Sequence, residues 1–406
     1  MSKQQDNAMA GIVEKCALVP KLRFPDFLEA GGWKFIPLSH LAIRTKQKNR
    51  DEKIERVLTN SAEFGVVDQR DFFDKDIATQ GKLEGYFVVE LGSYVYNPRI
   101  SSTAPVGPIS KNKIGTGVMS PLYTVFKFKD NSNDFYEHFF KTTGWHTYMR
   151  QASSTGARHD RMAISSDDFM AMPLPVASLD EQQKIADCLG SLDELIAAQA
   201  QQVEALKIHK KGLMQQLFPR AGETQPRLRF PEFQDEWMAQ DLEELSESIS
   251  SGKDKVATDG AFDLYGSTGI IGKTKNCSYG GTYILVARVG ANAGLLTKTT
   301  GEFGVTDNTL IIILNAKQNI DFIFYYLDQI GLNKMVFGSG QPLITGGQLK
   351  ALTIRLPKER EQQRIASCLS SLDTLITLEI QKLETLKTHK KGLMQQLFPS
   401  AQAVAA

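Results

Sequence analysis

The sequence predicts a mixed α/β (α+β) protein in which two globular domains are separated by two long helices. The main observation is an internal repeat: residues 181–219 and 361–399 align without a gap, and 27 of their 39 positions are identical, so one element occurs twice. A shorter repeat, P-[KR]-LRFP-[DE]-F, occupies residues 20–27 and 226–233. The segments between these repeats show no comparable match. We therefore predict a pseudo-two-fold frame, made of the repeats, that holds two dissimilar domains.

The repeated stretch has the apolar spacing of a long helix. Its apolar side chains follow a 4-3-4-3 register, which is typical of a coiled-coil seam. The register consists of Ile185, Leu189, Leu192, Ile196, Val203, Leu206, Leu213 and Leu217 in the first copy, and of Ile365, Leu369, Leu372, Ile376, Leu383, Leu386, Leu393 and Leu397 in the second. Gly212 and Gly392 mark either a close helix approach or the helix end, because an interior glycine destabilises a helix by ~1 kcal/mol relative to alanine.

Both segments between the repeats contain strand-like and helix-like runs. Strands rich in β-branched and aromatic residues are predicted at residues 85–96, 122–128, 282–289 and 309–314. Helices are predicted at residues 133–150 and 321–336. The two short LRFP repeats carry two prolines each, and we expect them to form extended strands that dock on the domains.

These patterns divide the chain into six parts. They are a flexible N-terminal tail at residues 1–19, a first domain at 20–178, a first repeated helix at 179–219, a second domain at 220–358, a second repeated helix at 359–399 and a tail at 400–406. Because only residues 220–225 join the first helix to the second LRFP repeat, the second domain must begin at the far end of that helix. We expect the second helix to run back antiparallel to the first.

Composition places the chain among globular proteins. Its 406 residues, 42% of them hydrophobic, are enough for two full cores. No apolar run approaches the length of a membrane span and the polar N-terminus is not a signal peptide, so we expect a cytoplasmic protein without a membrane partner. Cys188 and Cys368 are expected to be buried thiols. A net charge of +1 means that any nucleic-acid surface must be built locally.

The motifs that suggest catalysis have the wrong spacing or lack residues. Residues 266–274 (GSTGIIGKT) resemble a phosphate-binding P-loop, but five residues rather than four separate the first glycine from Gly-Lys-Thr. Residues 97–100 (NPRI) lack the second proline and the aromatic residue of the amino-methyltransferase motif, and a turn is the role we expect for them. The six histidines have no metal-ligand spacing. We therefore predict no active site and no metal site in this chain.

Basic side chains nevertheless cluster in several predicted loops. Phosphate contacts require Lys or Arg, whereas base reading favours Arg on guanine and Asn or Gln on adenine. A glycine-rich loop beside Lys273 and Lys275 would also allow close approach of a DNA phosphate. The candidate DNA-binding residues are Arg44, Lys46, Lys48, Arg50, Arg99, Lys111, Lys113, Arg158, Arg161, Lys253, Lys255, Lys273, Lys275, Arg288 and Asn292.

At this point the frame itself is informative. Two variable domains, each followed by a nearly identical EQQ[KR]IA…L…LD…L helix that ends in GLMQQLFP, resemble the specificity (S) subunit of type I restriction-modification systems. The resemblance covers residues 20–399, and the phrases YGSTGIIG and LVARVGANAG are also similar to segments of that family's recognition domains. It implies that each domain, called a target-recognition domain, reads one half of a bipartite, asymmetric site in double-stranded DNA, and that the helices set the spacing.

The resemblance also implies partners. Two methyltransferase (M) subunits would dock on the chain, and restriction (R) subunits would join in the full complex. S-adenosylmethionine, ATP and magnesium would be bound by those partners, so that no cofactor is expected on this chain.

A shared core explains the identity of the two helices only along their seam. Because polar positions are also identical, we predict that the polar faces bind the same M subunit twice. The docking candidates are Gln182, Gln183, Lys211, Gln215, Gln362, Gln363, Lys391 and Gln395. A non-catalytic DNA-recognition subunit is thus the favoured interpretation. A coiled-coil scaffold with protein-binding domains and, less favoured, a stand-alone DNA adenine methyltransferase or nucleotide hydrolase are the alternatives.

Overall fold

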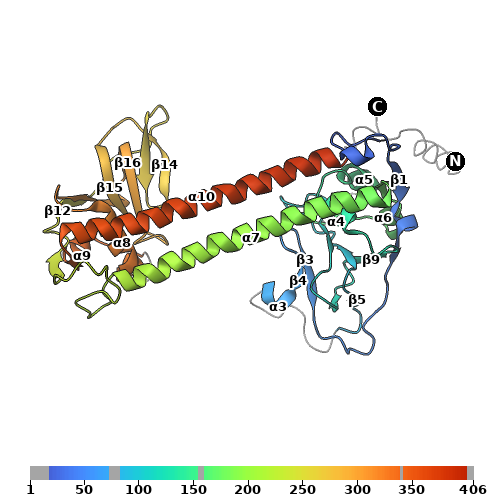
Figure 1. Ribbon diagram of the computed structural model, residues 1–406, viewed down its shortest axis with the longest axis horizontal. Helices are drawn as coiled ribbons and strands as arrows, with labels where there is room; N and C mark the ends of the chain where they lie inside the picture. The colour runs from blue at the N-terminus through green and yellow to red at the C-terminus, as the bar shows by residue number, and fades with distance from the viewer. Residues whose placement is uncertain (1–17, 73–82, 154–159, 339–341, 400–406) are drawn as a thin grey trace. The chain divides into compact units, whose positions relative to one another are not determined.

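The chain folds into two compact units. A computed structural model describes residues 18–72, 83–153, 160–338 and 342–399 (Figure 1). Unit 1 comprises Met1–Ala197 with Glu384–Ala406, and unit 2 comprises Ala198–Leu383. Each of the two long helices therefore contributes one part to each unit.

The described part of unit 1 contains a four-stranded antiparallel sheet and three two-stranded ribbons. The sheet has the order β2-β9-β6-β7, and the ribbons are β1-β10, β3-β4 and β5-β8. The strands are β1 Lys34–Pro37, β2 Ala42–Arg44, β3 Leu58–Ser61, β4 Gly65–Asp68, β5 Phe87–Val89, β6 Tyr94–Tyr96, β7 Ile109–Lys111, β8 Gly117–Met119, β9 Thr124–Phe128 and β10 Pro173–Val176. The helical elements are η1 Pro25–Phe27, α2 Leu38–Leu41, α3 Gln69–Phe72, α4 Asp134–Phe140, α5 His146–Ala152 and α6 Ser166–Met170.

Aromatic side chains dominate the main core of unit 1. Tyr94 of β6 stacks on Phe126 of β9 with ring centroids 5.5 Å apart, and Phe135 of α4 packs edge-on against Trp33 at the same centroid distance. Full burial of such a side chain contributes roughly 1.5–3 kcal/mol. The same core includes apolar side chains of the two long helices, namely Ile185, Ala186, Leu189, Met394 and Leu397.

The described part of unit 2 contains a six-stranded sheet and one two-stranded ribbon (Figure 1). The sheet has the order β12-β17-β15-β16-β13-β14, in which β13 and β16 pair parallel, and the ribbon is β11-β18. The strands are β11 Met238–Asp241, β12 Ser246–Ser251, β13 Phe262–Gly266, β14 Gly269–Thr274, β15 Tyr279–Ala287, β16 Leu296–Val305, β17 Thr309–Leu314 and β18 Thr353–Leu356. The helical elements are α8 Ile320–Ile330, η2 Leu332–Met335 and α9 Gly346–Lys350.

Helix α8 covers the core of unit 2 and has clear end signals. The side chain of Asn319 accepts a hydrogen bond from the N–H of Phe322 at the N-terminus, which satisfies one of the free donors there. The helix ends at Gly331, whose φ of 72° is left-handed and favours glycine. The core under α8 again includes side chains of the long helices, namely Met214, Leu217, Ile365, Ala366 and Leu369.

The two long predicted helices are confirmed. Helix α7 spans Leu179–Leu217 and α10 spans Glu359–Leu397, each with 39 residues. Both stop two residues before a proline, because the residue that precedes proline is disfavoured in helical backbone. Within unit 2 they are antiparallel: Gln199 donates to Glu379 at 2.5 Å, and Lys210, further along α7, donates to the earlier Asp373 at 2.6 Å.

Gly212 and Gly392 lie inside the helices and not at their ends. Helix α7 continues to Leu217 and α10 to Leu397, and a Cβ added at either glycine would meet nothing within 4 Å beyond its own helical turns. Neither a close helix approach nor a helix end accounts for these glycines, so both interpretations from the sequence are wrong. Each glycine instead leaves an open place on a helix surface.

Replacing these glycines is expected to stabilise the chain. Gly212→Ala and Gly392→Ala should each raise the free energy of unfolding by ~1 kcal/mol, because alanine is the better helix former and the space for its Cβ is empty. The measurement is the urea midpoint of the purified chain. Gly294→Ala is the contrasting control, because φ there is +86° and an added Cβ would lie 2.4 Å from the nitrogen of Asn333. A lower midpoint for Gly212→Ala would contradict the open surface.

Several shorter elements differ from the prediction. The helix predicted at residues 133–150 is two helices, α4 and α5. The Thr142 hydroxyl donates to the carbonyl of Phe139 at 2.7 Å and accepts from the N–H of Gly144, and such local bonds compete with a continuing helix. The strand predicted at residues 85–96 is divided into β5 and β6 by a turn at Gly92, whose φ is 81°.

Two further expectations are corrected. The LRFP repeats form no strand: the first contains the short helix η1, and the second has turns only. Cys188 and Cys368 are half-buried, not buried, because they lie beside the seam and not in it.

Candidate nucleic-acid and subunit interface

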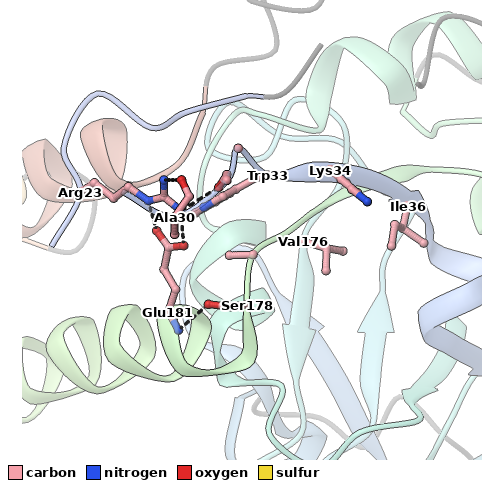
Figure 2. Close-up of a pocket in the computed structure, with 11 residues that line it drawn as sticks. Arg23, Ala30, Trp33, Lys34, Ile36, Val176, Ser178 and Glu181 are labelled. Atoms are coloured by element: carbon pink, nitrogen blue, oxygen red, sulfur yellow. Dashed lines mark hydrogen bonds and ion pairs between the residues drawn. The ribbon is translucent and has the colours of Figure 1, made fainter. Parts of the chain in front are cut away.

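In unit 1 the LRFP repeat ties together two helix ends. Nε and Nη2 of Arg23 donate to the two carboxylate oxygens of Glu181 in the first turn of α7, each at 2.7 Å. Both side chains are buried, and Figure 2 shows them among the residues that line a pocket. The preceding N–H, of Leu22, donates to the carbonyl of Gln396 near the end of α10 at 3.0 Å. Residues 20–27 therefore hold the start of α7 beside the end of α10.

Unit 2 contains the same contacts. Arg229 donates through Nε and Nη2 to both oxygens of Glu361, each at 2.7 Å, and the N–H of Leu228 donates to the carbonyl of Gln216 at 2.9 Å. Glu361 and Gln216 are the repeat mates of Glu181 and Gln396. We call residues 20–27 and 226–233 the LRFP clamps. From the sequence we predicted that these segments dock on the domains, but we did not predict their buried ion pairs.

Helices α4 and α8 occupy equivalent places in their units. Phe135 of α4 packs on Phe398 with ring centroids 5.0 Å apart, and Phe322 of α8 packs on Phe218 at 5.4 Å. Phe398 and Phe218 are repeat mates at the ends of the long helices. The two domains thus share an aromatic anchor to the frame, although their sequences show no comparable match.

Beside this anchor, unit 2 has a polar contact between the domain and the helices. Asp373 of α10 accepts hydrogen bonds from Lys210 of α7 at 2.6 Å and from the hydroxyl of Tyr325 of α8 at 2.7 Å. The ammonium of Lys210 also lies 4.9 Å from the centroid of the Tyr325 ring. Burial and the hydrogen bond to Asp373 raise the pKa of Tyr325, which keeps it a proton donor.

Unit 1 has the corresponding contact with different domain residues. Asp193 of α7 forms an ion pair with Lys390 of α10, and the ammonium of Lys141 lies 3.7 Å from the same carboxylate. Nδ1 of His138, on α4, is 3.9 Å from Asp193 and has no hydrogen-bond partner among the described residues. Burial and the charges of Lys141 and Lys390 lower the pKa of His138 to about 4, so the imidazole is neutral at pH 7. We call the contact at Asp373 in unit 2 and the contact at Asp193 in unit 1 the helix–domain joints.

The joints were missed at the sequence level, although a signal was present. Lys210 and Lys390 interrupt the apolar register at the same place in both copies, and Asp193 and Asp373 are identical as well. Charged residues that repeat inside an apolar register indicate a specific ion pair. Their domain partners could not be found, because no alignment connects α4 with α8.

Among the DNA-binding candidates, four lysines already form ion pairs. The pairs are Lys111–Asp134, Lys113–Glu137, Lys273–Asp263 and Lys275–Asp259, with distances of 2.6–2.8 Å. The glycine-rich stretch at residues 266–274 lies in the β13-β14 hairpin, in which Gly266 pairs with Gly269. A hairpin has no helix N-terminus at which a P-loop would hold phosphate. In the four ion pairs, the acids offset the charges of the four lysines.

Six other candidates are exposed and form no side-chain hydrogen bond or ion pair within the part of the chain that the structure describes. They are Lys46, Lys48, Arg50 and Arg99 in unit 1, and Lys253 and Lys255 in unit 2. Arg44 is half-buried and donates to the hydroxyl of Ser166. Arg158 lies outside the described residues. These six exposed cations therefore have no internal partner among the described residues.

Two candidate arginines are held differently. Arg161 and Arg288 each bury an Nε that forms no hydrogen bond with a described residue, although Nε of Arg161 lies 3.6 Å from the carboxylate of Asp160 in an ion pair. Nη1 of Arg288 donates to the carbonyl of Asp307 at 3.4 Å. Such burial restricts the guanidinium to one orientation and leaves the Nη groups as its outer donors. Asn292 is exposed in the turn after β15.

The docking candidates separate into two groups. Gln182 and Gln362 are 6% exposed, and each amide donates to a backbone carbonyl of its own unit, of Ala177 and Pro357. We therefore correct the prediction for these two residues, because their amides are used internally. The other six candidates are exposed: Gln183, Lys211, Gln215, Gln363, Lys391 and Gln395. The amide of Gln363 accepts a hydrogen bond from Asn319 at 2.7 Å.

The described residues contain no cluster of three or more His, Cys, Asp or Glu side chains that could hold a metal ion. Within the same ranges, no helix has the length and apolar character needed to cross a membrane.

Comparison with known proteins finds one family model that matches part of the chain. Residues 235–388 match the family "Type I restriction modification DNA specificity domain". The matched residues include the strands β11 to β18 of unit 2 and α10 as far as residue 388. The EcoprrI specificity subunit of Escherichia coli is 32% identical over 114 residues, which cover 28% of this chain and 28% of that relative. The MjaVIII specificity subunit of Methanocaldococcus jannaschii is 27% identical over 334 residues, 74% of this chain and 73% of the relative.

A second relative from Methanocaldococcus jannaschii, the putative MjaX specificity subunit, is 26% identical over 263 residues. The match covers 28% of the EcoprrI subunit and 61% of the MjaX subunit, so the chain spans less than two thirds of these two relatives.

Two solved structures share the fold. The S subunit of a type I system from M. genitalium has a TM-score of 0.58 and 13% identity, with 94% of this chain and all 100% of that chain covered. A chain from a structure titled as the basis of complex assembly and conformational transition of the type I R-M system has a TM-score of 0.57 and 14% identity, with 91% and 98% covered.

Proposed function

We propose that this chain is the DNA sequence-specificity subunit of a type I restriction-modification complex and is not catalytic alone. The observation that carries the proposal is the duplicated frame around unlike domains. The clamps, the aromatic anchors and the Asp–Lys pairs recur contact by contact, whereas the two sheets have different strand numbers and orders. Such a design suits a protein that uses one kind of partner twice and binds two different ligands.

Each target-recognition domain would read one half of a bipartite, asymmetric site in double-stranded DNA. The exposed lysines and arginines would contact phosphates, and Arg288, Asn292 and Arg161 would read base edges. The long helices would pair as an antiparallel coiled coil with pseudo-two-fold symmetry and so set the spacing. Half-sites about one helical turn apart, ~10 base pairs, can be read from one face of the duplex.

Catalysis would belong to partner subunits. Two M subunits would bind S-adenosylmethionine and methylate adenine, and R subunits with ATP and magnesium would complete the complex. The exposed polar residues that are identical in α7 and α10 support two equivalent docking surfaces on this chain.

Charge reversal on those surfaces is expected to weaken assembly. In the double variant Lys211→Glu/Lys391→Glu, both docking surfaces lose an exposed cation and gain an acid, so M-subunit binding should fall at least about tenfold. The measurement is co-purification and titration of the M subunit at low salt. Lys317→Glu is the control, since Lys317 is exposed but lies outside both helices. Equal M-subunit binding by both variants would count against a docking surface at these lysines.

The function is tested by methylation-sensitive sequencing of DNA from a host that expresses this chain with its M subunit. We expect methylated adenine at one asymmetric bipartite motif with a constant spacer, and none in a host that expresses the M subunit alone. Methylation by this chain alone would favour a stand-alone methyltransferase. A complex that binds DNA without sequence preference would favour a scaffold.

A further inference from the structure

We infer that the residues which each domain presents at its helix–domain joint are positioning residues that keep the half-site spacing constant. They are Tyr325 in unit 2, and Lys141 with His138 in unit 1. This inference rests on the proposed function, because it concerns how firmly a recognition domain is held on the helices.

The helix side of the two joints is the same. Lys210 pairs with Asp373 in unit 2, and their repeat mates Lys390 and Asp193 pair in unit 1, so each pair joins α7 to α10. An Asp–Lys pair presents one charge of each sign to the domain packed beside it. The frame therefore offers the same polar contact to two domains of unlike sequence.

The domain side differs in charge. Counted along the chain from the anchors Phe135 and Phe322, His138 and Tyr325 are equivalent positions. The ammonium of Lys141 lies 3.7 Å from the carboxylate of Asp193, whereas the neutral hydroxyl of Tyr325 donates to Asp373 and its ring centroid lies 4.9 Å from Lys210. The same carboxylate thus accepts a cation from one domain and a neutral hydroxyl donor from the other, so the pair is constant while its partners vary.

The joint in unit 2 is well suited to prevent rotation of the domain. Asp373 uses one carboxylate oxygen for Lys210 and the other for Tyr325, so three helices meet at one charged group. Hydrogen bonds to a charged group are directional and about twice as strong as neutral ones. The aromatic anchor alone fixes the distance between α8 and the long helices but tolerates sliding, since apolar contact is not directional. The polar joint fixes the orientation.

The test uses the complete methyltransferase complex and DNA duplexes whose spacer is the cognate length or one base pair longer or shorter. The measured quantity is the ratio of the methylation rate on the cognate spacer to the rate on the altered spacers. Tyr325→Phe keeps the ring and loses the hydrogen bond, and we expect this ratio to fall about fivefold. Lys141→Met should also lower this ratio. Neither variant should change the bases that are read in the two half-sites.

The matched control is Tyr283→Phe, which removes a hydroxyl that donates to the carbonyl of Gly280 in the same unit, away from α8. A merely structural role would lower the unfolding temperature and all methylation rates together, with an unchanged ratio. An unchanged ratio in both folded joint variants would overturn the inference. Absence of a bipartite motif for the wild-type complex would instead overturn the proposed function, so the two failures are distinguishable.

Discussion

Replacement of residues 38–172 by the corresponding segment of another specificity subunit is expected to change one half of the methylated motif and leave the other half intact. The reason is structural: this segment leaves and re-enters the frame through the β1-β10 ribbon, whose four residue pairs run from Lys34↔Val176 to Pro37↔Pro173. The clamp and the long helices stay unchanged. Methylation of the original motif should fall below detection, and sequencing of host DNA reports the new motif directly.

The matched experiment replaces residues 242–352, between β11 and β18 of unit 2. The ribbon there pairs Met238↔Leu356 through Asp241↔Thr353, so the exchange points are equivalent. This variant should keep the half-site that the first variant lost. If either replacement altered both halves, base recognition would be shared between the domains and the modular interpretation would be wrong.

The frame was predictable from sequence because its signals are periodic and doubled. An apolar period sustained over Ile185 to Leu217 requires a helix whatever surrounds it, and α7 and α10 end within two residues of the predicted ends. The domains were harder, because short strands depend on partners far away in the sequence. The composition of residues 133–150 predicts one helix, but the local hydrogen bonds of Thr142 divide this stretch into two helices.

The functional residues were only partly predictable. Candidate cations in loops can be named from the sequence, but their ion-pair partners cannot. Four of the candidate lysines form ion pairs with nearby acids. Gln182 looked like a surface residue by its identity in the repeat, yet its position in the first turn of α7 buries it against the β10–α7 connection. The joints depend on Tyr325 and His138, whose equivalence exists only in three dimensions.

Glu181→Ala is expected to lower the free energy of unfolding of unit 1 by about 3–5 kcal/mol. Glu361→Ala should have a smaller effect in unit 2, because the side chain of Arg229 is 19% exposed. The side chains of Glu181 and Arg23 are 1% and 4% exposed. Removal of the carboxylate therefore leaves a guanidinium buried without its counter-charge. The remaining acceptors of Arg23, the carbonyls of Ala30 and Gly31, are neutral and cannot replace it. Urea unfolding followed by tryptophan fluorescence measures the change, because Trp33 and Trp145 report on unit 1 and Trp237 on unit 2.

Two controls separate the buried charge from loss of the clamp as such. Glu384→Ala removes an exposed pair with Lys387, whose side chains are 62% and 50% exposed, and should leave the midpoint unchanged. The double variant Arg23→Met/Glu181→Met removes both charges and keeps the volume, so it should recover most of the lost stability. If the double variant were as unstable as Glu181→Ala, the clamp would act through its specific hydrogen bonds to Ala30, Gly31 and the helix start. Recovery by the double variant would instead mean that the buried ion pair mainly specifies which clamp geometry forms, and that apolar packing supplies the stability.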